Sequence, residues 1–147
     1  MRLVPYVPGG PVPPERLYAL LAPAVFQPTP QRLAALLRER YARQDAQLYL
    51  LHHRDAPIGV VGVCMAGAGA AEILHIAVDA RRRGQGAGRA IIDALFAMGK
   101  VEELRAETDA AAVGFYRRCG FRVQSLGERY AEIERFLCIA QRPSASP

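Results

Sequence analysis

Three glycines at every second position, Gly84, Gly86 and Gly88, stand between an apolar stretch and a helical pattern. The apolar stretch covers residues 71–78, and the helical pattern begins with the letters AIIDALFAM. Glycines let a turn wrap closely, so that its backbone N–H groups converge, and the dipole of the following helix adds positive potential. Arginines flank the turn on both sides. We therefore expect this turn to bind the pyrophosphate of a cofactor.

The turn does not follow the two common phosphate-binding patterns. A P-loop needs Gly-x-x-x-x-Gly-Lys followed by Ser or Thr, and the chain has no such run. The dinucleotide pattern Gly-x-Gly-x-x-Gly fails because the sixth position counted from Gly84 is Arg89. The structural alternative is a glycine-rich turn without a ligand. Each glycine would then weaken the helix start by up to about 1 kcal/mol relative to alanine.

The composition is that of a globular protein. The 147 residues suffice for a sizeable core, and the contents of 51% hydrophobic and 22% charged residues are ordinary. No run approaches the roughly 18 apolar residues that cross a bilayer, and the first residues lack the apolar centre of a signal peptide. We expect no association with membranes.

Cysteine usage and charge narrow the compartment and the partners. Three cysteines without Cys-x-x-Cys spacing predict neither a disulfide framework nor a zinc site, and they fit the reducing cytoplasm. His52 and His53 are adjacent and would point to opposite faces of a strand, so no metal site is expected. The net charge of +5 is moderate and its arginines are spread, which favours an acidic small ligand over a nucleic acid.

Hydrophobic periodicity and turn residues predict alternating strands and helices. The predicted strands are residues 2–7, 47–53, 58–66, 71–78, 104–108, 122–126 and 132–140. The predicted helices are residues 14–25, 30–43, 88–98 and 110–118. The second helix has Thr29 as its predicted N-cap and Pro30 at its first position. The element order is therefore β-α-α-β-β-β-α-β-α-β-β.

This order predicts an α+β fold in which a mixed sheet carries helices on both faces. Consecutive strands are expected to pair antiparallel, whereas residues 71–108 are expected to form a right-handed parallel strand–helix–strand crossover. Residues 1–141 are expected to form a single domain, because no linker or repeat interrupts them. The last six residues, RPSASP at 142–147, are expected to form a disordered tail.

Two separate segments resemble the motifs of one family. The run from Arg83 to Gly88 has Arg, two residues, Gly, one residue and Gly, five positions after the aliphatic Val78. Residues 109–121, with the sequence DAAAVGFYRRCGF, match a second motif that usually begins with Asn. Together they resemble the GNAT superfamily of acetyl-CoA-dependent N-acetyltransferases. The resemblance implies a three-layer α/β/α fold with about seven mostly antiparallel strands.

The resemblance also implies roles for individual residues. The backbone of Ile76, Ala77 and Val78 would pair with the pantetheine arm of acetyl-CoA, in a V-shaped opening between the parallel strands. The backbone amides of the turn would wrap the pyrophosphate: Arg83, Gly84, Gln85, Gly86, Ala87, Gly88 and Arg89. Tyr116 would lie near the cofactor sulfur and protonate the departing thiolate, a group that needs a proton donor as charge develops on it. A core aromatic with an ordinary hydrogen bond is the alternative for Tyr116.

The incoming amine must lose a proton before it can attack, so a base is required. The candidates are Glu72, His75 and Glu107. Glu72 corresponds to the strand glutamate that serves as base in the histone-acetylating branch of the family, and it is the predicted base. Strict alternation along the strand would place Glu72 and His75 on opposite faces, unless a bulge intervenes. Glu107 ends the neighbouring parallel strand, where open sheets place ligands.

Asp109 and Cys119, near the predicted site, are expected to have structural roles. Asp109 stands where the family often has Asn, and it is well suited to cap the helix that follows. Cys119 is expected to pack as a small core residue, without an acyl-cysteine intermediate.

The predicted function is transfer of the acetyl group from acetyl-CoA directly to a primary amine. The acceptor, a small molecule or a protein, is not encoded in any motif, and the protein is expected to be a monomer or a homodimer. The alternative function is a non-catalytic acyl-CoA binding or sensing module on the same fold.

Overall fold

A single seven-stranded sheet organises the part of the chain that the structure, a computed structural model, describes, residues 1–144. The strands lie in the order β1-β2-β3-β4-β5-β7-β6. Their bounds are β1 Arg2–Pro5, β2 Ala46–His53, β3 Ala56–Met65, β4 Ala70–Val78, β5 Glu103–Thr108, β6 Arg122–Glu128 and β7 Glu134–Gln141. The mixed α+β fold and the order of elements are confirmed.

Helices cover both faces of this sheet. Their bounds are α1 Pro14–Leu21, α2 Pro30–Glu39, α3 Ala87–Ala97 and α4 Val113–Arg118. Apolar residues of α1 and α2 pack with Leu50 and Val60 in one core cluster, and those of α3 and α4 pack with Val61 and Ile73 in another. Alternate side chains of a strand point to opposite faces, so neighbours such as Val60 and Val61 serve different cores. The three-layer arrangement follows from this alternation.

Local signals account for the helix boundaries. The Thr29 hydroxyl accepts a hydrogen bond from the backbone N–H of Arg32 at 3.1 Å, so the predicted N-cap of α2 is confirmed. The helix predicted over residues 110–118 begins only at Val113. The Asp109 carboxylate accepts hydrogen bonds from the N–H groups of Ala111 and Ala112, and these bonds hold residues 110–112 in a turn.

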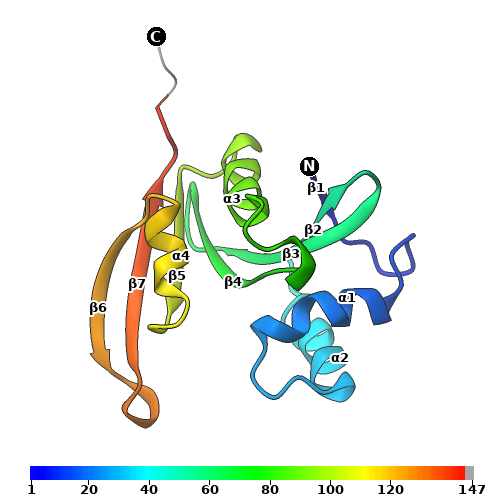
Figure 1. Cartoon of the computed structure of the whole chain (residues 1–147), viewed down its shortest axis with the longest axis horizontal. Helices are drawn as coiled ribbons and strands as arrows, with labels where there is room; N and C mark the ends of the chain where they lie inside the picture. The colour runs from blue at the N-terminus through cyan, green and yellow to red at the C-terminus, as the bar shows by residue number, and fades with distance from the viewer. Residues whose placement is uncertain (145–147) are drawn as a thin grey trace.

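The parallel crossover from β4 through α3 to β5 is also confirmed. Pairing between the two strands covers only residues 70–73 of β4 and 103–106 of β5, from Ala70↔Glu103 to Ile73↔Ala106. Beyond Ile73 the strands diverge, and Figure 1 shows β5, β7 and β6 turned away from the other four strands. The sheet therefore opens at the C-terminal ends of two parallel strands, the place where open sheets bind ligands.

A bulge in β4 changes the faces on which its side chains lie. His75 pairs with Gly62 and Ile73 pairs with Val63, so Leu74 is an extra residue with no partner in β3. Glu72, opposite Cys64, consequently shares a face with His75. The strict alternation expected for this strand is wrong at this point, and the bulged alternative is correct. Both side chains lie on the face of α1 and α2.

The chain termini lie apart from the opening (Figure 1). The backbone N–H of Arg142 donates to the carbonyl oxygen of Glu102 at 2.7 Å, and its guanidinium lies 3.2 Å from the Glu102 carboxylate. The rest of the tail predicted at 142–147 lies partly outside the described residues, since the description ends at residue 144. In residues 1–144, no helix is both long and apolar enough to span a membrane.

Candidate active site

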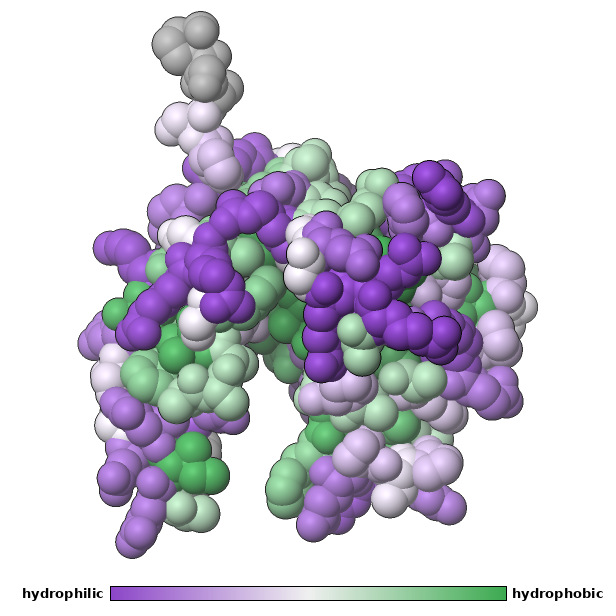
Figure 2. Space-filling model, viewed as in Figure 1, coloured by the Kyte–Doolittle hydropathy of each residue, from purple (hydrophilic) through white to green (hydrophobic). Residues whose placement is uncertain are grey.

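A cleft of about 1110 Å³ occupies the opening of the sheet. Its walls come from the end of β4, the glycine turn, the start of α3, the end of β5 and α4. Figure 2 shows it as a hollow between two lobes, with apolar atoms inside and hydrophilic atoms beside its upper part. Of the predicted cofactor-binding residues, ten line this cleft: Ile76, Ala77, Val78, Arg83, Gly84, Gly86, Ala87, Gly88, Arg89 and Tyr116. Gln85 is not among its lining residues.

The edge of β4 inside the cleft is free for pairing. Residues 75–78 pair with β3 on one side, from Gly59↔Val78 to Gly62↔His75. On the other side, the register with β5 ends at Ile73. Successive residues of a strand direct their N–H and C=O groups to alternate edges. Half of the backbone groups between Leu74 and Val78 therefore face the cleft, where an extended ligand with amide groups can pair with them.

The glycine turn has the geometry of an anion site. Gly84 and Gly86 have φ angles of 77° and 82°, which strain any residue with a Cβ atom. Gly86 is the N-cap of α3, and its carbonyl accepts the first helical hydrogen bond, from Ala90. The N–H groups of the first helical turn precede that bond, so they have no partner inside the helix. Convergent N–H groups at the positive end of an eleven-residue helix suit a pyrophosphate.

The third glycine, Gly88, is required at its position for a different reason. A Cβ atom at Gly88 would lie 2.5 Å from the Phe115 ring, closer than any real contact. Gly88 therefore lets α3 approach α4 where both helices line the cleft. The structure separates two causes for one sequence pattern: Gly84 and Gly86 shape the turn, and Gly88 permits packing.

Four arginines surround the turn in the cleft: Arg82, Arg83, Arg89 and Arg118. Arg89 donates a hydrogen bond to the backbone carbonyl of Arg118, which ties the first turn of α3 to the end of α4. The clustered guanidinium groups raise the local positive potential, and they add charge-assisted donors for phosphate oxygens.

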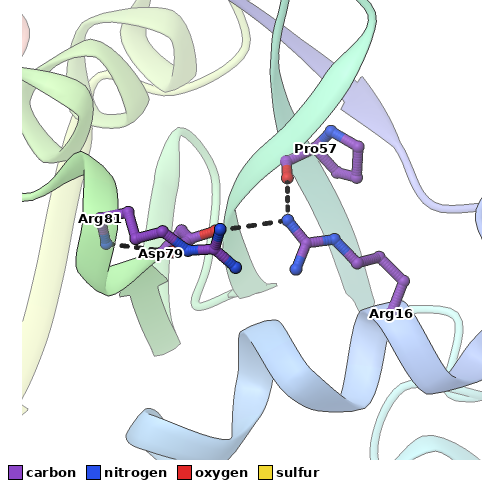
Figure 3. A network of polar contacts seen from close by, with 4 residues as sticks. All are labelled: Arg16, Pro57, Asp79 and Arg81. Atoms are coloured by element: carbon purple, nitrogen blue, oxygen red, sulfur yellow. Dashed lines mark hydrogen bonds and ion pairs between the residues drawn. The ribbon is translucent and has the colours of Figure 1, made fainter.

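Arg16 of α1 anchors the segment that leads into the turn (Figure 3). Its guanidinium donates to the carbonyl oxygen of Pro57 at 2.8 Å and to the Asp79 carboxylate at 3.4 Å. Asp79 also accepts a hydrogen bond from the backbone N–H of Arg81 at 3.0 Å. That backbone bond, followed by the bond from Arg16, lowers the pKa of the Asp79 carboxyl below its ordinary value. Asp79 thus connects α1, β3 and the cofactor turn.

We expect Arg16→Ala to lower the free energy of unfolding by about 1 kcal/mol, because the Pro57 carbonyl loses its donor and the exposed ion pair adds little. Affinity for coenzyme A should fall a few-fold, since the turn is less firmly held. Urea denaturation and calorimetric titration measure the two effects. Arg81→Ala is the matched control, because that guanidinium is 91% exposed and lies 4.0 Å from the same carboxylate. Equal losses in both variants would contradict the anchoring role.

Tyr116 combines burial with access to the cleft. Only 5% of the residue is exposed, and its ring packs edge-on against Phe115 and Phe121. Burial raises the pKa of its hydroxyl above the ordinary value, so the group remains protonated at neutral pH. Tyr116 is also one of the residues that line the cleft. A protonated hydroxyl in a ligand cleft can serve as a proton donor.

The three candidate bases occupy different positions. His75 and Glu107 line the cleft, whereas Glu72 does not. The Cys64 thiol points to the Glu72 carboxylate at 3.9 Å. One carboxylate oxygen of Glu107 forms an ion pair with the guanidinium of Arg135 at 3.3 Å. Of the two candidates that line the cleft, Glu107 is held in an ion pair, and His75 is in no ion pair among the described residues.

Sequence reasoning did not find three residues beside the site: Arg16, Tyr41 and Arg135. Arg16 and Asp79 are 63 positions apart, and Tyr41 and its partner His75 are 34 apart. No local pattern joins such pairs. Cys119 lines the cleft, and burial raises the pKa of its thiol, as expected for a packed residue rather than a nucleophile.

Solved structures share this fold. A GNAT family acetyltransferase from Elizabethkingia anophelis, solved with acetyl-CoA bound, aligns with a TM-score of 0.70 at 21% identity, covering 95% of this chain and 97% of the other. A dodecameric spermidine N-acetyltransferase from Vibrio cholerae aligns with a TM-score of 0.72 at 14% identity, covering 96% and 93%. At such identities the similarity shows the fold alone.

Sequence comparison shows the family. An uncharacterised N-acetyltransferase from the lysA 3' region of Bacillus methanolicus is 29% identical over 89 residues, which cover 60% of this chain and 72% of the relative. The family model described as an acetyltransferase (GNAT) domain matches residues 44–123, more than half of the chain and the part that contains β4, the glycine turn and Tyr116. On this match, and with the cleft described above, the chain belongs to the GNAT family of acetyltransferases.

Proposed function

We propose that this protein transfers the acetyl group of acetyl-CoA directly to a primary amine. The observation that carries the proposal is a juxtaposition in one cleft. The free edge of β4, the glycine turn and Tyr116 all border the same space. A ligand with amide groups, a pyrophosphate and a thioester needs these three features together.

The residues of the cleft fit acetyl-CoA as cosubstrate. The β4 backbone at Ile76, Ala77 and Val78 pairs with the pantetheine amides as an added strand does. Backbone amides from Arg83 to Arg89 hold the pyrophosphate, and the arginines beside them neutralise its charge. Gln85, predicted together with these residues, does not line the cleft, so its backbone amide is proposed only from its place within the turn.

Catalysis then depends on positioning and on two proton transfers. Backbone N–H groups of β4 polarise the thioester carbonyl as negative charge develops on its oxygen. Tyr116 gives its proton to the sulfur as the C–S bond breaks. Glu72 is the base that the family resemblance predicts, and His75 is the alternative candidate that lines the cleft. The position of Glu72 outside the lining of the cleft would require a water molecule between its carboxylate and the amine.

A thiol-release assay against a panel of primary amines tests the proposed function. We expect amine-dependent release of free coenzyme A, with formation of the acetylated amine confirmed by mass spectrometry. The panel should include spermidine, amino-acid derivatives and lysine peptides. Tight binding of acetyl-CoA with only slow, amine-independent hydrolysis would contradict catalysis and favour the acyl-CoA sensing module.

We also propose a cytoplasmic location, and coenzyme A rather than a nucleic acid as the partner. Cys64, Cys119 and Cys138 form no disulfide, which is consistent with the proposed cytoplasmic location. Binding of a nucleic acid would weaken steeply with salt, and we propose that coenzyme A binding dominates instead. Light scattering on the purified protein distinguishes the proposed monomer or homodimer from larger assemblies.

A further inference from the structure

A tyrosine and a histidine far apart in the sequence meet beside the cleft. The hydroxyl of Tyr41, just after α2, lies 2.6 Å from Nδ1 of His75 in β4. Their ring planes are inclined at 55°, with centroids 5.7 Å apart. His75 lines the cleft and Tyr41 does not. Any effect of Tyr41 on a bound substrate must therefore pass through the imidazole.

Two features of the backbone create this contact. The bulge at Leu74 turns His75 to the face of the sheet that α2 covers, where its cross-strand partner is Gly62. A Cβ atom at Gly62 would lie 1.7 Å from the Tyr41 hydroxyl oxygen. The absence of a side chain at Gly62 thus provides the space that Tyr41 fills. Without the bulge, His75 would point to the opposite face, and the tyrosine would have no partner there.

We propose that His75 accepts the proton of the incoming ammonium group at Nε2, and that Tyr41 is the positioning residue that holds the imidazole in the required tautomer. This inference rests on the proposed acetyl transfer. The 2.6 Å contact is compatible with either direction, and the proposed arrangement is the one in which Nδ1–H donates to the Tyr41 oxygen and Nε2 keeps its lone pair. The same hydrogen bond persists when Nε2 is protonated, because both ring nitrogens then carry hydrogen.

The proton transfers balance over one turnover. The acceptor ammonium gives one proton to Nε2 of His75, and the nitrogen lone pair forms the C–N bond with the thioester carbonyl carbon. The C–S bond breaks, and the sulfur takes its proton from Tyr116. The second proton that leaves the nitrogen restores the tyrosine, and His75 returns its proton to solvent. One acetyl group is transferred and one proton is released.

The surroundings of His75 keep the imidazole neutral at pH 7. Burial and, after it, the positive charge of Arg40 lower the pKa of His75 below its ordinary value of 6.5. The titratable or charged groups that interact with one another around Arg40 are Tyr41 beside α2, Cys64 of β3, Glu72 of β4 and Asp45, which lies 3.6 Å from Arg40. Burial raises the pKa of Tyr41, so its hydroxyl stays protonated and adds no negative charge.

The pH dependence of kcat/KM for the amine identifies the base. We expect an acidic limb with an apparent pKa below 6.5, because activity appears as His75 loses its proton. His75→Gln should lower kcat by about 100-fold and remove this limb. His53→Gln, at a histidine that does not line the cleft, is the matched control and should retain the limb. Glu72→Gln tests the base that the family resemblance predicts, and it should also retain the limb if His75 takes the proton. Loss of the limb in Glu72→Gln and its persistence in His75→Gln would overturn the proposal.

Tyr41→Phe separates positioning from a merely structural role. We expect kcat to fall about tenfold and the KM for acetyl-CoA to remain unchanged. The apparent pKa of the acidic limb of kcat/KM should change. A structural defect alone would lower thermal stability without moving the limb, and that result would contradict the role of Tyr41.

Nitrogen-15 NMR tests the tautomer without any turnover. The chain has three histidines, so the His75 signals can be assigned from the His75→Gln spectrum. We expect a protonated Nδ1 and an unprotonated Nε2 in the wild type at pH 7.5, and a mixture of tautomers in Tyr41→Phe. A protonated Nε2 in the wild type would overturn the proposal even if an amine is acetylated. Conversely, failure of every amine in the panel would overturn the proposed function, whatever the tautomer.

Discussion

Gly86→Glu is expected to weaken acetyl-CoA binding by about 100-fold or more, a loss of roughly 3 kcal/mol. Gly86 has a φ angle of 82° at the N-cap of α3, and the space beyond it is part of the cleft. A glutamate there would place a carboxylate among the N–H groups that we propose bind the pyrophosphate. It would compete for those donors, and it would repel the phosphates. Isothermal titration calorimetry with coenzyme A measures the loss.

Gly99→Glu provides a control at the other end of the same helix. Gly99 has a φ angle of 83°, and a Cβ atom there would meet nothing within 4 Å, as at Gly86. Both substitutions therefore impose similar backbone strain, but Gly99 does not line the cleft. We expect near wild-type affinity in Gly99→Glu. Equal affinity in Gly86→Glu and the wild type would mean that the glycine turn is not the pyrophosphate site.

Tyr116→Phe is expected to lower kcat by about 100-fold while the dissociation constant of acetyl-CoA changes by less than about threefold. The substitution removes the hydroxyl and retains the ring, which packs between Phe115 and Phe121. Without the hydroxyl, the thiolate must leave without a proton from the protein. Steady-state kinetics with the best amine of the panel, together with calorimetry, separate the two effects.

Tyr49→Phe is the matched control for this substitution. Tyr49 packs against the same hydrophobic core as Tyr116, and burial also raises the pKa of its hydroxyl. It does not line the cleft, so its removal should leave kcat unchanged. Unchanged turnover in Tyr116→Phe would exclude the tyrosine as the proton donor. An equal loss in both variants would indicate a general effect of core polarity.

Most of the fold was predictable because its signals are local. Thr29 and Pro30 mark the start of α2, and Asp109 caps the turn that precedes α4. The apolar stretches of β3 and β4 predict strands, and each strand is present within a few residues of its predicted bounds. The helix boundary at residue 110 was wrong by three positions, since the Asp109 bonds stabilise a turn rather than a full helical start.

The candidate site was predictable only in part. The spacing between Val78, the glycine turn and Tyr116 predicts a cofactor site, because these residues lie on β4, the turn into α3 and α4, which follow one another closely in the chain. The role of Gly88 could not be separated from those of Gly84 and Gly86 on sequence alone. Gly88 is needed because a side chain there would collide with the ring of Phe115, which lies 27 positions later in the chain. The glycine pattern alone does not distinguish a bent backbone from a close contact.

The amino-acid sequence by itself determined the family, the order of elements and the cofactor turn, because each depends on residues that are near one another in the chain. The tertiary structure decided which base faces the cleft. The bulge at Leu74 depends on how β4 aligns with Gly62 and Val63 of β3, and no periodicity within β4 encodes that alignment. One extra residue moves His75 to the face of Glu72 and brings it to Tyr41. Side chains in contact across a sheet are selected by strand pairing, which forms only in the folded protein.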